Sequence, residues 1–499
     1  MNTAYVNSPD FSFFSEAKLH LDHIISELQS SELADNAHGD IEQYINKEGF
    51  EVLRCLFQGY LNMQATNEPQ HDFVTSSNGS QLTHVKHNTT RKLTCLFGDV
   101  IVTRKRYRQH KQVSHFPLDA QLNLSADQYS DGIRHRVAVE AVRGSFDNAI
   151  EAISKTTGGH VAKRQSLELV KDVAQDFESY YRQNRHQIAE QAEDLLVLTF
   201  DGKGVVMRPD GLRECTKKAA KKSKKLNSRL SPGEKKDRKR MAQVAAVYTV
   251  LPHIKTAESI MKVDSDDNNV KEFKSPARNK RVWASVEREA EVIIEEAFQE
   301  ALQRDPTQQR DWVILVDGLP HQLKLISRVM KRLKIEATVV MDFIHVLEYL
   351  WKAAWCFFDK GDDAVESWVA KKAVKILNGY GNQVAKGIRI SASKQKILKR
   401  ENVDKCANYL LKNKDRLRYG EALTLGYPIA SGVIEGACRH LINDRLDITG
   451  ARWSLGGAEA ILKLRSLKSS GDFDNYWTFH KQLSKDRRHR WSTNERSIK

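Results

Sequence analysis

The sequence lacks the features that mark secreted, membrane-spanning and zinc-binding proteins. Its six cysteines lie far apart and form no CxxC pair, so we expect neither a zinc ribbon nor a disulfide framework. No window approaches eighteen uninterrupted apolar residues, and the N-terminus has no basic segment followed by an apolar one. We therefore expect no membrane span and no secretory signal, and a cytoplasmic location.

What the sequence has in excess is positive charge. It contains 79 Lys and Arg against 64 Asp and Glu, which gives a net charge of +15. A basic protein attracts polyanions, of which nucleic acid is the commonest partner, although charge alone is weak support. With 499 residues, of which 40% are hydrophobic, the chain is long enough for three or four domains with buried cores.

The first third of the chain predicts helices, a linker and a hairpin. Residues 1–66 have apolar residues at helical spacing, and residues 67–90 are polar and read as a linker. The alternating segment 91–108 predicts two short strands joined at Gly98-Asp99, within a region that extends to residue 124. The basic end of this hairpin is either a solvated edge or a contact for a phosphate backbone.

Residues 125–190 predict a helix-turn-helix-like region. One helix is expected near 146–155 and a second from about His160, with a break at Thr157–Gly159 between them. The second helix begins with Lys163, Arg164 and Gln165, where a recognition helix would meet base edges and phosphates. Structural pairing of two helices is the alternative, because helix pairs broken at glycine occur in proteins of every function.

From residue 191 the pattern becomes α/β. Apolar runs at 194–200, 241–251, 312–316 and 337–341 predict strands, and 321–333 predicts an amphipathic helix. Strands that alternate with helices indicate a sheet with parallel neighbours. We expect the core to span 191–351, to be interrupted by an all-helical segment at 352–420, and to resume at 421–475 before a basic tail at 476–499.

A strongly basic segment, 217–240, separates the first two predicted core strands. It holds twelve Lys and Arg against two acidic residues, and almost nothing apolar. Such a segment cannot bury surface, so we expect a solvated, mobile loop. It is either a solubilising loop or a clamp on nucleic acid; the clamp residues would be Lys217, Lys218, Lys221, Lys222, Lys224 and Lys225.

Two of the apolar runs end in an aspartate followed by glycine. Asp201 and Asp317 would lie at the carboxyl ends of strands in one sheet, where α/β proteins build their sites. Carboxylates from neighbouring strands can share Mg²⁺, which prefers oxygen ligands. The alternative for each is an ordinary Asp-Gly hairpin turn, and the apolar residues after Asp201 would suit a return strand.

A third carboxylate is expected from a helix that packs against the same edge. Ser431 and Gly432 open a helix with Glu435 in its first turn, and Arg439 follows one turn later. A carboxylate for metal and an arginine for phosphate suit phosphodiester chemistry. An ordinary salt bridge between residues four apart would also explain the pair.

Several blocks of the sequence resemble one family. They are FDGKG (200–204), VDGLPHQ (316–322), DFIHVLEYLWKAAW (342–355) and two longer segments, 116–153 and 431–477. Taken in their order along the chain, they resemble the ISKra group of bacterial insertion-sequence transposases, which are akin to the Mutator-like enzymes. The resemblance implies an RNase H-like fold in which Asp201, Asp317 and Glu435 form a DDE triad that holds Mg²⁺ (or Mn²⁺), as two ions.

The resemblance has further implications near the triad. The spacing of 118 positions from Asp317 to Glu435 matches relatives that insert a helical domain before the glutamate. Asp342-x-x-His345 resembles the (C/D)xxH motif of Mutator-like enzymes. We predict that the helix face with these two residues contacts the DNA end during cleavage. The alternative is that Asp342 is a fourth metal ligand. Arg439 and Arg452 would contact DNA. Residues 109–119 depart from some members in having no cysteine, so zinc is not expected there.

The sequence and the resemblance together predict an α/β RNase H-like catalytic core, which is a mixed sheet flanked by helices. An all-helical domain is inserted into this core. The N-terminal region, built of helices and a hairpin, is expected to bind DNA. Water would attack a phosphodiester at the end of the element, and the freed 3′-OH would attack target DNA. The partners would be terminal inverted repeats, target DNA and further copies of the chain, at the bacterial nucleoid. The alternatives are a DNA-binding protein without cleavage and a metal-dependent nuclease that does not join strands.

Overall fold

A mixed sheet of five strands carries the segments that the sequence marks as core. In the computed structural model its strands are β5 (Leu195–Val206), β6 (Lys239–Val250), β7 (Arg278–Ser285), β8 (Trp312–Val316) and β9 (Thr338–Met341). They lie in the order β7-β6-β5-β8-β9. The pairs β5–β6 and β6–β7 are antiparallel, and the pairs β5–β8 and β8–β9 are parallel. The expected mixed α/β sheet with parallel neighbours is therefore confirmed.

The structure describes residues 12–76, 78–183, 191, 193–222, 238–261, 276–448, 450–489 and 492–493. The chain forms two compact units, residues 1–180 with 474–499 and residues 181–473. No helix in the described segments is long and apolar enough to cross a membrane.

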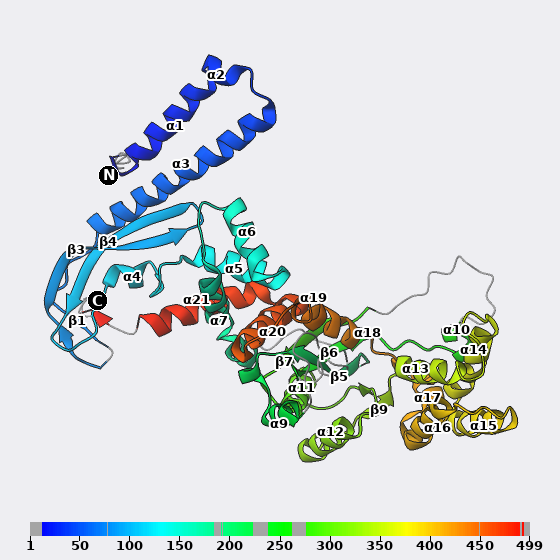
Figure 1. The fold of residues 1–499 in the computed structure, drawn as a ribbon. Coiled ribbons are helices and arrows are strands. Elements are labelled where there is room, and N and C mark those ends of the chain that lie inside the picture. Colours follow the sequence, from blue (N-terminus) through cyan, green and yellow to red (C-terminus); the bar gives the residue numbers. More distant parts are fainter. Residues whose placement is uncertain are drawn as a thin grey trace, which may run out of the picture. The chain divides into compact units, whose positions relative to one another are not determined.

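Burial explains why the core strands form where they do. All five residues of β8, the run WVILV, are buried, and so are the first six residues of β5. Such continuous apolar runs are typical of strands covered on both faces. Helices flank the sheet, as Figure 1 shows. The flanking helices and those that carry the chain between strands are α9 (Glu214–Lys222), α10 (Ala257–Met261), α11 (Ala290–Arg304), α12 (Pro320–Leu333), α13 (Phe343–Ala354), α18 (Gly432–Ala437), α19 (Asp444–Leu446) and α20 (Leu455–Ser470).

Between β9 and α18 the chain is helical, as the sequence predicts for 352–420. The helices there are α14 (Ala364–Leu377), α15 (Gly381–Lys394), α16 (Glu401–Lys412), the 3-10 helix η4 (Lys414–Arg416) and α17 (Tyr419–Thr424). Their buried residues recur at helical spacing, for example Val369, Ala373 and Ile376 in α14. One of these helices, α16, packs against α13, which follows β9 directly.

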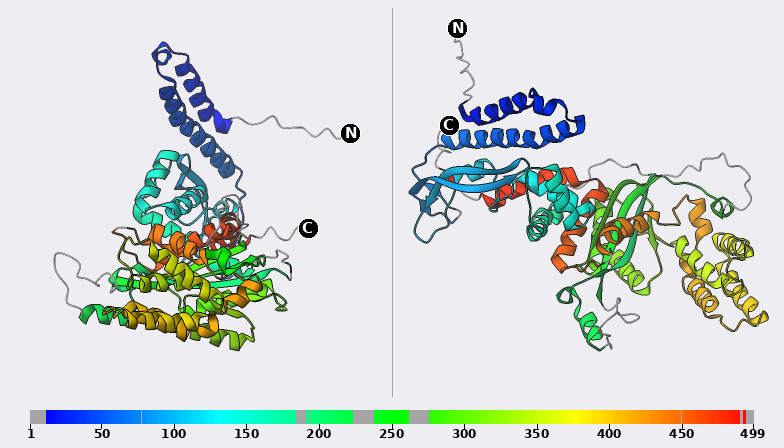
Figure 2. Two further views of the ribbon diagram at one scale, coloured as in Figure 1. Left: turned by 90° about the vertical axis from the view of Figure 1, so that its right-hand side faces the viewer. Right: turned by 45° about the horizontal axis from the view of Figure 1, so that its top comes forward.

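The other unit is built on a pair of long helices and a β-hairpin. Its helices are α1 (Ser15–Leu28), α2 (Ser31–Ala34), α3 (His38–Thr66), α4 (Pro117–Gln121), α5 (Asp131–Arg143), α6 (Phe146–Thr156), α7 (Lys163–Ala174), α8 (Phe177–Gln183, which crosses the unit boundary) and α21 (Phe473–Arg488), with a 3-10 turn η1 (Ser12–Phe14). Helices α1 and α3 run side by side in both views of Figure 2. The hairpin strands are β3 (His84–Cys95) and β4 (Gly98–Arg108), and β1 (Val74–Thr75), β2 (Gln81–Leu82) and β10 (Ser492–Thr493) form a small separate sheet.

Two predictions for the hairpin are wrong in detail. The segment 67–90 is not simply a linker, because β3 begins at His84 and β1 and β2 also lie within it. The turn residues are Leu96 and Phe97, since Cys95 pairs with Gly98 and Gly98 already belongs to β4. The first half of β3 is largely exposed, so its residues are polar and do not alternate as those of a half-buried strand do.

The tip of the hairpin packs on the glycine turn of the predicted helix-turn-helix. Helices α6 and α7 confirm the predicted pair, although α7 begins at Lys163 instead of His160. The N–H of Gly158 donates to the Leu96 carbonyl at 2.8 Å. A Cβ atom on Gly159 would come within 2.6 Å of the Cys95 carbonyl oxygen. The turn therefore needs glycine because the hairpin backbone lies against it.

Two basic segments are more ordered than predicted. Residues 217–222 belong to α9 and residues 239–240 to β6, so both ends of the predicted loop are part of regular elements. Residues 223–237, with Lys224 and Lys225, lie outside the described residues. The predicted tail begins inside helix α21, whose Tyr476, His480 and Ser484 are buried at helical spacing. These contacts hold α21 in the unit of the N-terminal residues.

Candidate active site

Asp201 and Asp317 lie at the same level of neighbouring strands. Strands β5 and β8 run parallel, and Thr199 is the partner of Leu315 at the last recorded pair. Each aspartate comes two residues later, and neighbouring strands are about 4.8 Å apart, so the two side chains lie next to each other. Asp317 directly follows β8 as predicted, whereas β5 continues past Asp201 because it still pairs with β6. No hairpin turn occurs at Asp201-Gly202.

Glu435 reaches the same site from a helix. It lies near the start of α18, as the sequence predicts, and α18 packs against β5 and β6. The helix then widens into a π-helix, η5 (Cys438–Asn443), a form that is often found at functional sites. Arg439 is therefore not one regular turn beyond Glu435: its side chain is exposed and lies 3.9 Å from Asp444. The expected Glu435–Arg439 arrangement is wrong, because the predicted spacing assumed an uninterrupted α-helix.

The three carboxylates line one cavity of about 210 Å³. Strand β5 contributes Asp201 and Lys203, the loop after β8 contributes Asp317, and α18 contributes Glu435. The other polar residues of the lining are Asp342, His345, Glu348, Ser431, Cys438 and Asn443. The structure thus brings together all three acidic residues that the sequence singles out, although they are separated by more than 200 residues along the chain.

The carboxylates of the cavity repel one another. Burial raises the pKa of Asp317, and the negative charge of Asp201 raises it further. Partial burial also raises the pKa of Glu435, and Asp342 and Asp201 add to that shift. Burial raises the pKa of the Cys438 thiol, whose Sγ donates to Asp201 Oδ2 at 3.1 Å. An excess of negative charge at the end of a sheet is the condition that a bound cation would relieve.

Asp342 is the neighbour of Asp317 on the next strand of the sheet, but its environment is different. Val316 pairs with Met341, so Asp342 is level with Asp317 on the next strand. The Asp342 side chain is only 2% exposed, and Oδ1 caps α13 by accepting from the Ile344 N–H at 2.9 Å. Its Oδ2 accepts from the N–H of Ser431 at 3.1 Å and from the Ser431 hydroxyl. Asp342 thus joins the start of α13 to the residue that precedes α18.

These contacts revise the prediction for the Asp342/His345 face. Both residues line the cavity, but Asp342 is too buried to contact a DNA end, and both of its oxygens are occupied by protein donors. His345 is about one-third exposed, and its Nδ1 lies 4.0 Å from the Glu348 carboxylate. Of the two, His345 alone keeps the exposure that a contact with DNA requires.

Three contacts of the site were not predicted from the sequence. The Tyr409 hydroxyl, from α16 in the helical segment, donates to the Asp317 carbonyl at 3.1 Å. Gly318 has φ of +89°, and a Cβ there would meet Met341 Cε and, at 3.3 Å, the Tyr409 ring. The helical segment therefore packs directly on the loop that carries Asp317. Cys438 was not predicted as a site residue either. Its position three residues after Glu435 indicates that the two share a helix face, so the spacing could have identified it.

The basic residues predicted to contact DNA lie on exposed surfaces. Lys163, Arg164 and Gln165 occupy the exposed first turn of α7, and Lys163 pairs with Asp147 at 2.6 Å. Arg452 is exposed in the segment before α20. The clamp residues of the described chain lie in α9, and all but Lys217 are exposed: Lys217, Lys218, Lys221 and Lys222. None of these residues lines the carboxylate cavity.

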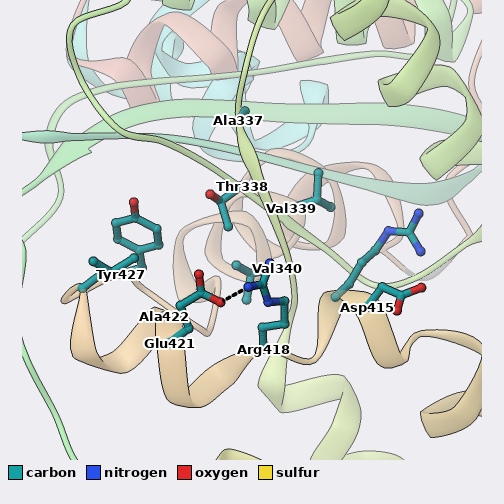
Figure 3. A pocket seen from close by; sticks show the side chains of 11 residues that line it. Ala337, Thr338, Val339, Val340, Asp415, Arg418, Glu421, Ala422 and Tyr427 are labelled. Carbon is teal, nitrogen blue, oxygen red and sulfur yellow. Dashed lines mark ion pairs between the residues drawn. The ribbon is translucent and has the colours of Figure 1, made fainter. Parts of the chain in front are cut away.

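A larger cavity, of about 370 Å³, lies beside the edge strand β9 (Figure 3). Its two acidic residues are Asp415 and Glu421, and Glu421 is paired with Arg418 at 2.6 Å. Glu421 and Arg418 point toward each other from α17 and the residue before it, as the dashed line in Figure 3 marks. This cavity has no cluster of acidic groups, so it is not the candidate active site.

Comparison with known proteins adds nothing to these observations, since neither the models of protein families nor the curated protein sequences match the chain. The resemblance to insertion-sequence transposases therefore rests on the sequence blocks alone.

Proposed function

We propose that the protein is a DDE-type DNA transposase that cuts and joins DNA at a carboxylate site in an RNase H-like core. One observation carries the proposal: strand register and helix packing bring Asp201, Asp317 and Glu435 to one cavity. The mixed sheet, with parallel strands at the site and the third carboxylate on a helix, supports the expected core. The helices of 352–420, inserted between β9 and α18, agree with an inserted domain.

The residues of the cavity suit divalent metal ions of the Mg²⁺ type. Mg²⁺ and Mn²⁺ prefer oxygen donors, and Asp201, Asp317 and Glu435 supply carboxylates at one sheet edge. The raised pKa values of Asp317 and Glu435 reflect burial and repulsion by other carboxylates of the cavity, Asp201 in both cases, which cations would relieve. In the described part of the chain, no three His, Cys, Asp or Glu side chains already form a metal-binding group. The fit therefore rests on donor chemistry and electrostatics.

The protein's own part in the reaction is positioning. When bound, paired metal ions activate the attacking oxygen and stabilise the leaving one. Asp201 and Asp317 are held at one level by the sheet, and Glu435 is held by α18, whose preceding residue is tied to Asp342. Lys203, one residue beyond Gly202 on β5, brings a positive charge to the lining for a substrate phosphate. Alignment of water or a 3′-OH with the phosphodiester is the main contribution of such a site.

DNA would be held mainly by basic residues outside the cavity. The exposed first turn of α7 is placed as the start of a recognition helix would be, and α9 offers a row of lysines for phosphate contacts. The partners under this proposal are the ends of the protein's own element and target DNA. Synapsis of two ends implies more than one copy of the chain.

The proposal is tested with a labelled duplex that carries the inverted repeat bracketing the gene, together with a supercoiled target plasmid and Mg²⁺. The wild type should nick the duplex at the repeat and join the 3′ end to the plasmid. Glu435→Gln should abolish both reactions and still bind the duplex. Glu348→Gln, a neutralised glutamate in the same cavity, should keep most of the activity.

Each alternative function predicts another result. A nuclease that does not join strands would yield nicked duplex without plasmid insertion. A DNA-binding protein without cleavage would bind the repeat and leave it intact in the wild type. Equal activity of wild type and Glu435→Gln would remove Glu435 from the site.

A further inference from the structure

A third cavity lies wholly within the unit formed by residues 1–180 and 474–499. It has a volume of about 530 Å³ and lies where α21 meets α5 and the turn of the β-hairpin. Figure 1 shows α21, from the far end of the chain, beside α5 and α7. The residues that matter in its lining are His135, Arg136, Trp477 and Lys481. Its volume is within the range of small-molecule sites, roughly 300–1,000 Å³.

The buried face of α21 fixes which of its side chains reach this cavity. The Tyr476 hydroxyl donates to the Val173 carbonyl, and His480 Nδ1 lies 2.7 Å from Asp176 Oδ2. Tyr476 and His480 are four residues apart and anchor one face of the helix. Trp477 and Lys481 each follow by one residue, so they share the next face and line the cavity together.

The aromatic residues of the lining, His135 and Trp477, contact each other and are only partly buried. The rings of His135 and Trp477 are 4.9 Å apart at 64°, an edge-to-face contact. Burial lowers the pKa of His135, the negative charge of Asp474 opposes that shift, and the nearby positive charges of Arg136 and Lys481 add to it. Trp477 is half-buried, and its ring also lies 5.7 Å from that of His480.

The two cations of the cavity, Arg136 and Lys481, differ from neighbouring arginines, which form ion pairs. Arg487 and Arg488 on the same helix pair with Asp176 at 2.9 Å and with Asp172 at 3.1 Å. Within the described residues, neither Arg136 nor Lys481 has a carboxylate within 4 Å. Asp131 also lines the cavity. Burial raises the pKa of its carboxyl, and nearby positive charges, of which Lys481 is one, oppose that shift. The site therefore offers unpaired positive charge beside a partly exposed indole.

We propose that this cavity binds one nucleotide of single-stranded DNA, with the base against Trp477 and the phosphate between Arg136 and Lys481. Exposed aromatic rings and a positive surface together are the means by which proteins hold unpaired nucleotides. An acidic peptide would satisfy the cations but leave the indole without a flat partner. The inference rests on the proposed function only in taking DNA as the ligand, and it uses no residue of the carboxylate cavity.

The test is direct binding of a fluorescein-labelled dT12 strand and of the dT12·dA12 duplex to the full-length protein, in EDTA. Base stacking on an aromatic side chain contributes substantially per base, so Trp477→Ala should weaken binding of the single strand roughly tenfold. Binding of the duplex should change less than twofold. Trp477→Phe should retain most of the affinity because it keeps an aromatic ring.

Charge variants separate the cavity from general electrostatics. Lys481→Gln should weaken single-strand binding by more than Lys485→Gln, which removes the same charge one turn further along α21, outside the cavity lining. Equal losses for the two variants would overturn the proposal, as would equal losses of Trp477→Ala on both DNAs. Competition by polyglutamate as effective as that by unlabelled dT12 would also overturn it, in favour of an acidic peptide. Because EDTA prevents cleavage, a failure here is distinct from a failure of the catalytic proposal.

Discussion

The ends of β8 and β9 carry the same residue at the same level of one sheet, with different surroundings. Asp317 follows β8, which is buried throughout, and Asp342 follows β9, of which only the last two residues are buried. Asp342 is almost fully buried and gives both oxygens to protein donors. Asp317 is partly exposed, and its Oδ1 accepts from the Leu319 N–H at 2.9 Å. In the described residues its Oδ2 has no side-chain donor.

The difference shows that hydrogen-bond partners decide what a carboxylate can do. An oxygen that already accepts strong hydrogen bonds from protein is a poor metal ligand, whereas an oxygen with free lone pairs can bind a cation. Asp317 is therefore suited to metal chemistry. Asp201 accepts from the Gly202 N–H at 2.6 Å and from the Cys438 thiol at 3.1 Å, and a thiol is only a weak donor. Asp342 instead fixes the position of Ser431 and, through it, the start of α18. The predictions below test this division, beginning with the largest effect.

The largest effect is expected for Asp317→Asn. Loss of one carboxylate should slow nicking of the labelled repeat by at least about a thousandfold, because metal ions contribute several kcal/mol of charge stabilisation. Affinity for the same duplex, measured in EDTA, should stay within about twofold. A variant that nicks at the wild-type rate would remove Asp317 from the triad.

A smaller effect is expected for Asp342→Asn. The side-chain oxygen of Asn can still cap α13 by accepting from the Ile344 N–H. Its NH₂ group then lies against the Ser431 N–H, and a donor cannot accept that hydrogen bond. Nicking should slow by roughly ten- to a hundredfold, the usual range for residues that orient a metal ligand. Ser431→Ala should slow it less, because the backbone N–H of residue 431 remains.

The double variant Asp342→Asn/Ser431→Ala decides how Asp342 acts. If Asp342 acts through Ser431, the two effects should be clearly less than additive, as for residues in direct contact. Independent, additive losses would instead favour the rival role of Asp342 as a fourth metal ligand.

Gly318→Ala tests the contact of the helical segment with the Asp317 loop. The change strains a positive φ and also forces Met341 and Tyr409 away, so unfolding free energy should fall by about 1–3 kcal/mol from overpacking alone. The matched control is Gly361→Ala, where φ is +91° but a Cβ would meet nothing within 4 Å. Thermal unfolding should show a clearly larger loss of stability for Gly318→Ala than for Gly361→Ala. Equal losses of stability would mean that backbone strain alone accounts for both.

The smallest effect concerns stability and pH. Burial and Asp201 raise the pKa of Asp317 above its unfolded value, so its contribution to stability is lost as the pH rises through that raised pKa. Without divalent ions at pH 7, Asp317→Asn should therefore melt a few degrees higher than the wild type. The difference should vanish below the ordinary pKa range of aspartate. A variant that melts lower at pH 7 would show that the ionised carboxylate stabilises the fold.

Much of the sheet and the triad could be predicted because they depend on local sequence. Runs such as WVILV are long and apolar enough to identify β8, and the aspartate after each run marks the sheet edge. Glu435 was found from helix-start residues together with the resemblance of its sequence block. Strand β7, with the sequence RNKRVWAS, was missed because its polar first half hides the pattern.

The parts that could not be predicted depend on contacts between distant residues. No local pattern shows that Asp342 meets Ser431, 89 residues later, or that Tyr409 meets the Asp317 loop. The orientation of Arg439 was wrong because the π-helix that changes it has no simple sequence signal. Helix α21 was taken for a tail because its charged residues outnumber the few that anchor it.

The most direct test of the account is a count of the Mn²⁺ ions bound at saturation, measured by electron paramagnetic resonance with end DNA present. The account predicts two ions on the wild type, the same number on Asp342→Asn, and fewer on Asp317→Asn. Loss of ions from Asp342→Asn to the same extent as from Asp317→Asn would contradict it, and so would a wild-type protein that binds none.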